Sequence, residues 1–279
     1  MSRASCFAVF VLVLPLGGCP GPNPIIPEAG GDYQRVQSDA LSCLPNNNGT
    51  IELSKLAFPI GVNVPYRVNP PGTVVDVDVA GSTVDGVPHW DFTSLAGDVS
   101  SIKLEDATGF WFAKSFPSAT FAVGSDITGD TLQVFRLDTS GNQLLLLGLA
   151  SRKPDVTLMV YDTPVVSLRY PLKAGDSINS TGNVQNGKLR GLPIATTDTY
   201  AVKVDALGSL QLPNLKFDNT LRVLITVTSS AVGGAKATVR QAQWFHECYG
   251  ELVRAVSQKD ETNALFTKAT ELRRMSMTN

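Results

Sequence analysis

The sequence is poor in charge and has no excess of basic residues. Charged residues make up 17% of its 279 residues, and 23 basic side chains stand against 25 acidic ones, for a formal net charge of −2. A nucleic-acid binder held mainly by bulk charge needs a basic excess, so that class is excluded. Apolar residues reach 43%, which excludes wholesale disorder, because disordered chains combine low hydrophobicity with high net charge.

Residues that bind metals are scarce. The sequence has two histidines, His89 and His246. His246 and Cys248 could supply two zinc ligands, but a zinc site needs three or four at matched spacing. Residues 46–51 are similar to the middle of an EF-hand loop, but the loop's end positions fall on Leu44 and Lys55, which are not calcium ligands. We therefore expect no metal and no cofactor.

Catalytic motifs are also missing. Gly175-Asp176-Ser177 resembles the first block of GDSL-type hydrolases, but the Asp-x-x-His element that those enzymes need near the C-terminus is absent. No Gly-x-Ser-x-Gly elbow, phosphate loop or dinucleotide fingerprint is present. An envelope hydrolase would require His89 or His246 beside a serine and a carboxylate. We predict no catalytic residues and favour a non-catalytic binding or structural protein.

Residues 1–18 have the plan of a secretory signal peptide. Arg3 precedes an apolar run at 7–16, and small residues follow. The run is far shorter than the roughly 20 residues that span a bilayer. Leu16-Gly17-Gly18-Cys19 resembles the lipobox of bacterial lipoproteins, in which the cysteine takes a diacylglycerol and the signal is cut just before it. This resemblance implies lipidation at Cys19, with acyl chains that anchor the protein in a membrane.

Residues 19–42 are predicted to be the lipidated cysteine and a Pro/Gly-rich tether. Alternating prolines at 20, 22 and 24 favour an extended chain. Pro20 stands where aspartate would favour retention at the inner membrane, so resemblance to enterobacterial sorting implies the outer membrane. We expect an exported protein on the periplasmic or surface face, with the membrane as partner through the anchor. A protein or surface polymer is a further expected partner, and nucleic acid is not.

Two cysteines remain after the signal and the lipidation site. Cys43 and Cys248 stand near the two ends of the rest of the chain. A pair of cysteines in an exported protein suggests a disulfide, which would join the start of the fold to its last part. The alternative is two buried thiols that do not meet.

The remaining sequence is patterned for strands. Apolar and polar residues alternate at 75–79, 200–205 and 221–228, and Asn186-Gly187 is a hairpin turn signal. We predict a mainly β fold, an antiparallel meander forming a curved sheet, sandwich or half-barrel with little helix. The segment 264–275 fits a helix or a strand, and 52–57 is a weaker helix candidate. Residues 43–279 are predicted to form one globular domain, with a division near 163 as the alternative.

Aromatic residues gather in one region of the sequence, at Trp90, Phe92, Phe110, Trp111, Phe112, Phe116 and Phe121. Of these, Trp90, Phe92, Trp111, Phe112 and Phe116 are the candidate pocket residues. A cluster of this density usually belongs to a core. It can also line an apolar pocket. The second interpretation would make the protein a carrier of an apolar ligand or lipid.

Several short motifs occur in an order that resembles a family of uncharacterised predicted lipoproteins from myxobacteria and related deltaproteobacteria. The motifs are Trp90-Asp91-Phe92, Trp111-Phe112-Ala113, Phe116-Pro117, Tyr170-Pro171-Leu172, Gly175-Asp176-Ser177, Val204-Asp205-Ala206-x-Gly208, Leu221-Arg222-Val223, Glu247-Cys248-Tyr249-Gly250 and Glu271-Leu272-Arg273-Arg274. At 213–217 the chain has Pro-Asn-Leu-Lys-Phe instead of the Pro-Tyr-Gly-x-Phe expected of the family. The resemblance implies export, lipidation and a β fold, and it implies no activity.

Overall fold

The structure is a computed structural model that describes residues 43–154 and 156–276. All of these belong to one compact unit. The predicted signal peptide at 1–18, the lipidation site Cys19 and the tether at 19–42 lie outside the described residues.

Strands joined mostly by short turns make up this unit. In chain order they are β1 (Thr50–Ile51), β2 (Asn63–Val68), β3 (Val75–Asp76), β4 (Ser82–Val84), β5 (Val87–Asp91), β6 (Asp98–Lys103), β7 (Glu105–Asp106), β8 (Phe121–Gly124), β9 (Thr131–Asp138), β10 (Gln143–Ser151), β11 (Leu158–Arg169), β12 (Leu172–Lys173), β13 (Ser177–Leu189), β14 (Leu192–Leu212), β15 (Leu215–Ala231), β16 (Lys236–His246), β17 (Gly250–Ser257) and β18 (Lys268–Met275). Three short 3-10 helices accompany them, η2 (Leu53–Lys55), η3 (Ala107–Gly109) and η4 (Ala113–Ser115).

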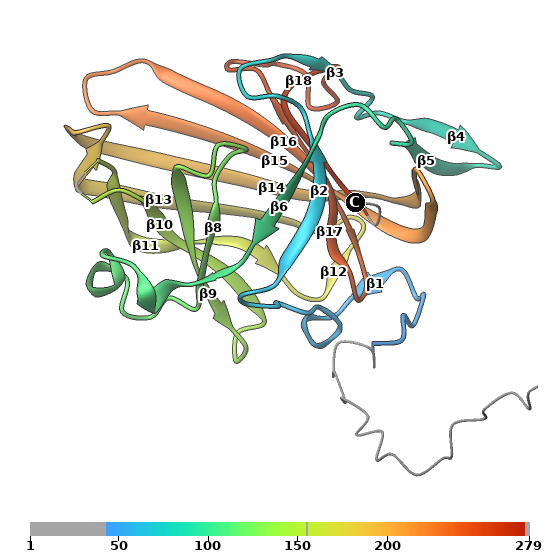
Figure 1. The fold of residues 1–279 in the computed structure, drawn as a ribbon, viewed down its shortest axis with the longest axis horizontal. Coiled ribbons are helices and arrows are strands. Elements are labelled where there is room, and N and C mark those ends of the chain that lie inside the picture. The colour runs from blue at the N-terminus through green and yellow to red at the C-terminus, as the bar shows by residue number, and fades with distance from the viewer. Residues whose placement is uncertain (1–42, 155, 277–279) are drawn as a thin grey trace, which may run out of the picture. The chain divides into compact units, whose positions relative to one another are not determined.

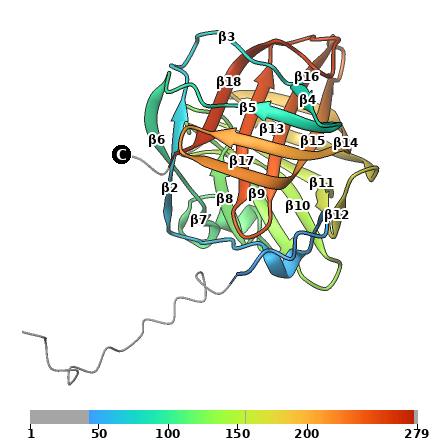
Figure 2. The same cartoon turned by 90° about the vertical axis from the view of Figure 1, so that its right-hand side faces the viewer.

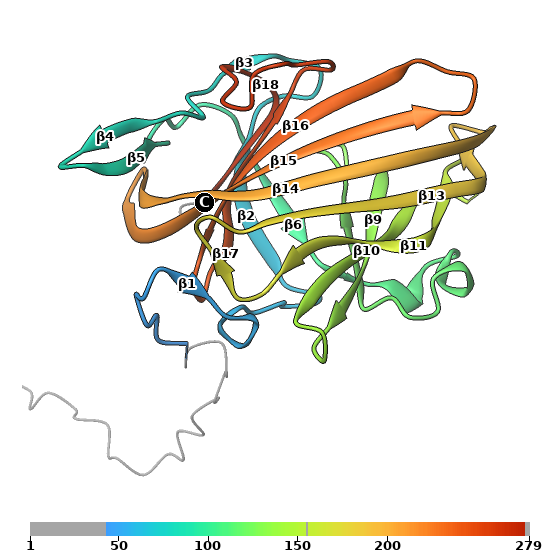
Figure 3. The ribbon, with the colours of Figure 1, turned by 180° about the vertical axis from the view of Figure 1, so that it is seen from behind.

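Thirteen strands form one antiparallel path in the order β6-β2-β18-β17-β16-β15-β14-β13-β11-β10-β9-β8-β7. Figures 1 and 3 show this meander curling until it nearly closes into a barrel. The edge strands β6 and β7 are consecutive in the chain, with only Leu104 between them. The chain itself therefore brings the two edges of the sheet together. The prediction of a mainly β, antiparallel meander is confirmed.

Bulges and one close backbone contact allow the long strands to curl. β14 has 21 residues, and bulges near Asp205 and Ser209 interrupt its register with β15. A bulge bends its strand and increases the local twist. β10 has a register shift beside Gly148 against both neighbours. A Cβ at Gly148 would lie 1.9 Å from the Met159 carbonyl oxygen, so the chain can make this approach only with glycine.

The buried side chains form one cluster inside the curl and two on its outer face. Neighbouring residues of a strand point to opposite faces, and Phe245 of β16 accordingly belongs to the inner cluster while Trp244 belongs to an outer one. Figure 2 shows β4 and β5 crossing the outer face of the sheet, and Trp90 of β5 belongs to this second cluster. The third cluster packs the η3–η4 segment against β8, β9 and β10, with Phe112 at its centre.

A buried arginine fastens the β3–β5 segment to the sheet. Arg222 of β15 donates to both carboxylate oxygens of Asp205 at 2.9 and 2.7 Å. Its Nη1 also donates to the carbonyl oxygens of Val79 and Ala80 at 2.5 and 3.0 Å, and its guanidinium lies 5.1 Å from the Trp90 ring centroid. The charge is thus paired and its hydrogen bonds are used, as burial requires.

The structure assigns the two segments that were helix candidates in the sequence. Residues 268–275 form strand β18, which pairs with β17 and β2, so the helical alternative for 264–275 is wrong. The candidate at 52–57 contains only η2. The alternative domain boundary near 163 falls within strand β11.

Candidate ligand-binding site

The inside of the curled sheet contains a cavity of about 370 Å³. Its lining comes from β2, β6, β8, β9, β10, β11, β14, β15, β16, β17 and β18, and from residues 56–62 that precede β2. Pockets that hold small ligands have volumes of roughly 300–1,000 Å³. The cavity is therefore large enough for a small ligand or for part of a longer one.

The walls of the cavity are mainly apolar and aromatic. The Phe121 ring stacks on Phe58 and on Phe135, with centroids 5.9 and 5.4 Å apart. Leu146 and Val202 add aliphatic surface from opposite strands. Apolar surface moved from water into such a site contributes roughly 25 cal/mol per Å². An apolar chain would therefore be stabilised in the cavity.

One part of the wall carries a buried ionic cluster. Glu251 of β17 accepts hydrogen bonds from Arg254 through Oε2 at 3.0 and 2.7 Å, and from Arg273 through Oε1 at 2.9 and 2.6 Å. The Tyr66 hydroxyl donates to the Glu251 carbonyl oxygen at 2.6 Å. Burial by itself would raise the pKa of the Glu251 carboxyl, but the two arginines outweigh it and hold the pKa below its usual value. Glu251 is therefore ionised at neutral pH.

The charged residues that line the cavity are two arginines, Arg254 and Arg273, and one glutamate, Glu251. Glu271 lies next to Arg273, with 3.8 Å between its Oε1 and Arg273 Nε, but it does not line the cavity, and burial raises the pKa of its carboxyl. Both arginines bind Glu251 through Nε and Nη2, so the Nη1 of each takes no part in this pairing.

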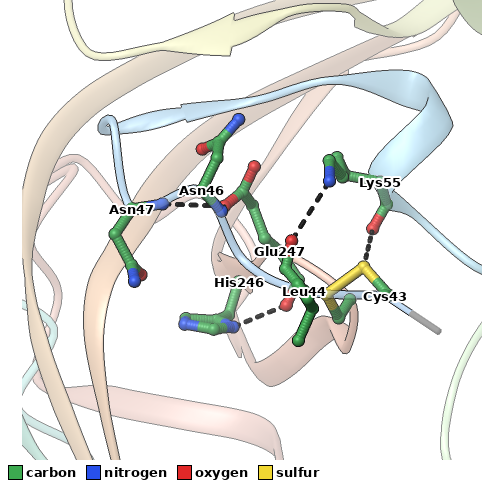
Figure 4. Close-up of a disulfide and its surroundings, with 8 residues drawn as sticks. Cys43, Leu44, Asn46, Asn47, Lys55, His246 and Glu247 are labelled. Atoms are coloured by element: carbon green, nitrogen blue, oxygen red, sulfur yellow. Dashed lines mark hydrogen bonds between the residues drawn. A yellow bond between two sulfur atoms is a disulfide. The ribbon is translucent and has the colours of Figure 1, made fainter. Parts of the chain in front are cut away.

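A segment at residues 43–62, here named the strap, contributes residues 56–59 and 62 to the cavity wall. It is tied to the β16–β17 turn by the Cys43–Cys248 disulfide, with Cα atoms 5.5 Å apart (Figure 4). Cys248 N donates to Lys55 O at 2.9 Å, and the backbone N of Asn46 donates to Glu247 Oε2 at 2.8 Å. The disulfide prediction is confirmed, and the bridge holds part of the cavity wall in place.

A polar cluster lies on the other side of the cavity along β14. The Tyr161 hydroxyl donates to Asp198 Oδ2 at 2.7 Å and lies 3.3 Å from the Tyr200 hydroxyl. Thr196 Oγ1 donates to Asp198 Oδ1 at 3.2 Å. Burial raises the pKa of Tyr200 to about 12. Tyr200 lines the cavity, and the hydrogen-bonded side chains of Tyr161, Asp198 and Thr196 lie behind it.

The five candidate pocket residues, Trp90, Phe92, Trp111, Phe112 and Phe116, do not line this cavity. Trp90 and Phe92 pack in the outer cluster beneath β4 and β5, and Phe92 also borders a second cavity of about 290 Å³ there. Phe112 and Phe116 are buried in the third cluster, and Trp111 packs beside them with its Nε1 donating to Ser151 O at 2.8 Å. The structure thus divides these residues between two cores.

The two histidines have separate surroundings. His89 Nδ1 lies 2.8 Å from Ser209 Oγ, but no carboxylate in the described part of the chain forms a hydrogen bond with His89. His246 Nδ1 lies 2.6 Å from Glu247 O, and its ring packs against Phe217. Across residues 43–154 and 156–276, no three His, Cys, Asp or Glu side chains are grouped to hold a metal ion.

None of the helices in the described residues is long and apolar enough to cross a bilayer. No protein-family model matches the chain, and no curated protein or solved structure matches it either. The resemblance to predicted lipoproteins therefore stays a prediction. Function has to be inferred from the chemistry of the cavity.

The sequence analysis named Phe121 and Cys248 but did not place them in a cavity, and it did not identify Glu251 or Arg254. The available signal was a charged residue, Arg273, within the segment that forms β18. Arg273 belongs to one of the motifs of the family resemblance, yet nothing in the sequence placed it beside Glu251.

Proposed function

We propose that the protein is a carrier that binds an anionic amphiphile inside its curled sheet. The observation that supports this function is the 370 Å³ cavity, which combines apolar walls with an excess of arginine. The apolar chain of the ligand would contact Phe121, Phe135 and their neighbours. A carboxylate or phosphate head group would accept hydrogen bonds from the Nη1 atoms of Arg254 and Arg273, whose charge makes such bonds strong.

The proposal is tested with dodecanoate and dodecanol, which have the same chain and differ in head-group charge. Calorimetry on the full chain, purified without detergent, should give a Kd for dodecanoate about tenfold lower than that for dodecanol, because hydrogen bonds to charged groups contribute roughly 1.5–3 kcal/mol. Native mass spectrometry of the same sample should detect a bound amphiphile.

A matched pair of variants locates the binding. Val202→Trp places an indole in the cavity, whereas Val160→Trp places it on an exposed position of β11. Val202→Trp should weaken dodecanoate binding at least tenfold with its thermal melting retained, and Val160→Trp should bind as the parent does. Equal binding by both variants, or no binding by the parent chain, would contradict the proposal.

We also propose that the protein is exported and anchored by lipid at Cys19, at the outer membrane. The lipobox resemblance at 16–19 supports this, and these residues lie outside the described ones. Cys19→Ser should move the protein from the membrane fraction to the soluble fraction, with Cys6→Ser as the matched control. Continued sedimentation of Cys19→Ser with membranes would contradict the anchor. A protein or surface-polymer partner stays a prediction.

A further inference from the structure

Three loops meet at the end of the sheet that is remote from the strap. The β13–β14 turn contacts the loop before β11, because Gly191 N donates to Val156 O at 2.7 Å. The β15–β16 turn contacts the start of β14, because Val232 N donates to Ala195 O at 3.0 Å. Figures 1 and 3 show these hairpins projecting from the same side of the sheet. We name this surface, formed by residues 153, 156, 189–192 and 231–236, the hairpin end.

Apolar side chains at the hairpin end are exposed to solvent. Val232 is 82% exposed and Leu192 is 70% exposed, and Leu189 and Val156 are 38% and 39% exposed. All four lie on the loops joined by the hydrogen bonds above. Single exposed apolar residues are ordinary, whereas a group on adjacent loops indicates an interaction site.

The charge around this group has one dominant sign. Lys153, Arg190 and Lys236 are exposed, and the stretches 186–195 and 229–238 contain no acidic residue. The described carboxylate that contacts this region is Asp260, which accepts a hydrogen bond from Thr238 N, two residues beyond Lys236. Asp155 stands between Lys153 and Val156 in the sequence and offsets the charge of Lys153, so the positive excess rests on Arg190 and Lys236. Cations beside exposed aliphatic side chains are complementary to an anionic membrane surface, where the cations meet head groups and the apolar tips meet acyl chains.

The hairpin end is far from the disulfide. Lys236 begins β16, and His246 ends it two residues before Cys248. The strand has 11 residues, which corresponds to about 35 Å at roughly 3.4 Å per residue. The hairpin end and the strap are therefore separate surfaces of the protein.

We propose that the hairpin end docks on an anionic lipid bilayer, with Leu192 and Val232 inserted at the interface and Arg190 and Lys236 at the head groups. This docking is independent of the cavity, and its test does not use the cavity. For a carrier of amphiphiles, the docked state would bring the protein to the phase from which its ligand comes.

The test uses a tryptophan at the tip and vesicles that contain brominated phosphatidylcholine. In the full chain, Val232→Trp is compared with Val84→Trp, which places the same reporter on another exposed hairpin, beside Asp85 instead of a basic residue. Quenching of the Val232→Trp fluorescence should require phosphatidylglycerol in the vesicles and should weaken with salt. Val84→Trp should not be quenched.

The second part of the test removes the two basic side chains proposed to meet the head groups. Adding Arg190→Gln and Lys236→Gln to Val232→Trp should raise the vesicle concentration for half-maximal quenching about 25-fold, or fivefold per charge. Quenching at both reporters, at neither, or equally without phosphatidylglycerol would overturn the proposal. Protection of Val232→Trp from iodide that increases with protein concentration, without vesicles, would also overturn it and indicate a contact between copies of the chain.

Discussion

The two ends of the curled sheet are built in opposite ways. The strap end has a disulfide, backbone hydrogen bonds and the buried Glu251 cluster within a few residues of Cys248. The hairpin end has long strands that project past the core, with Val232 and Leu192 exposed at their tips. Stabilising contacts are therefore concentrated at the strap end, whereas the hairpin end is free to contact a surface.

The largest effect is expected from removing the disulfide. Cys43→Ala with Cys248→Ala releases a loop with a sequence separation of 205 residues. The chain-entropy model gives a loss of up to about 5 kcal/mol in the free energy of unfolding. Urea denaturation of the double variant measures it, with the parent protein in reductant as the control. An unchanged midpoint would mean that the strap does not depend on its bridge.

The next effect is expected inside the ionic cluster. Glu251→Gln leaves Arg254 and Arg273 buried without their anion, which should cost about 3–5 kcal/mol at neutral pH. Chemical denaturation of this variant is compared with that of Glu52→Gln, an exposed position on the strap. A loss of less than about 1 kcal/mol would show that the cluster behaves as a surface ion pair.

Acid should lower the free energy of unfolding by protonating the Glu251 carboxylate. The pKa of Glu251 is lower in the folded protein than its ordinary value of 4.5. Its stabilisation is therefore fully present above that ordinary value and is lost as the pH falls through the lowered pKa. Unfolding free energies measured between pH 6 and pH 3 (about the range that spans this titration) should fall more steeply for the parent than for Glu251→Gln. Parallel slopes would contradict this assignment.

The smallest effect is expected at the hairpin end. Leu192→Ser and Val232→Ser remove apolar groups that have little packing to lose, so the free energy of unfolding should change by no more than about 0.5 kcal/mol. Thermal and urea unfolding of both variants measure this change. A loss above 1.5 kcal/mol (about the lower bound for burying such a side chain) would mean that the tips are packed in solution, and the contrast between the two ends would fail.

The sequence motifs have structural roles that could not be read from the sequence. Asp205 and Arg222 form the ion pair that fastens the β3–β5 segment. Gly208 lies where a Cβ would come within 2.2 Å of the Pro88 carbonyl oxygen, so glycine lets β5 pack alongside β14. Arg274 is buried beside the second cavity, and it donates a hydrogen bond to Ser94 O at 2.7 Å. Each partner is distant in sequence, and local patterns carry no information about such pairs.

The aromatic residues illustrate the same limit. Their crowding in sequence favoured a core over a pocket, and the structure buries Trp90 and Phe112 in two different outer clusters. Of the crowded residues, Phe121 lines the cavity, and the other aromatic residues of its wall, such as Phe58 and Phe245, come from segments spread along the chain. Density in sequence therefore indicated burial but did not locate the cavity.

Strand alternation and two cysteines suited to a bridge could be read from the sequence, because the side-chain period acts over a few residues. The hairpin turn predicted at Asn186-Gly187 was wrong, because these residues lie inside β13 beside a register shift and the chain turns at Arg190-Gly191, both of which have positive φ. Only the tertiary structure decided which face of each strand points inward, how the two edges of the sheet meet at Leu104, and that Glu251, Arg254 and Arg273 share one cavity. Curling and closure depend on contacts between distant strands, and a period of two marks two faces without saying which one becomes the inside.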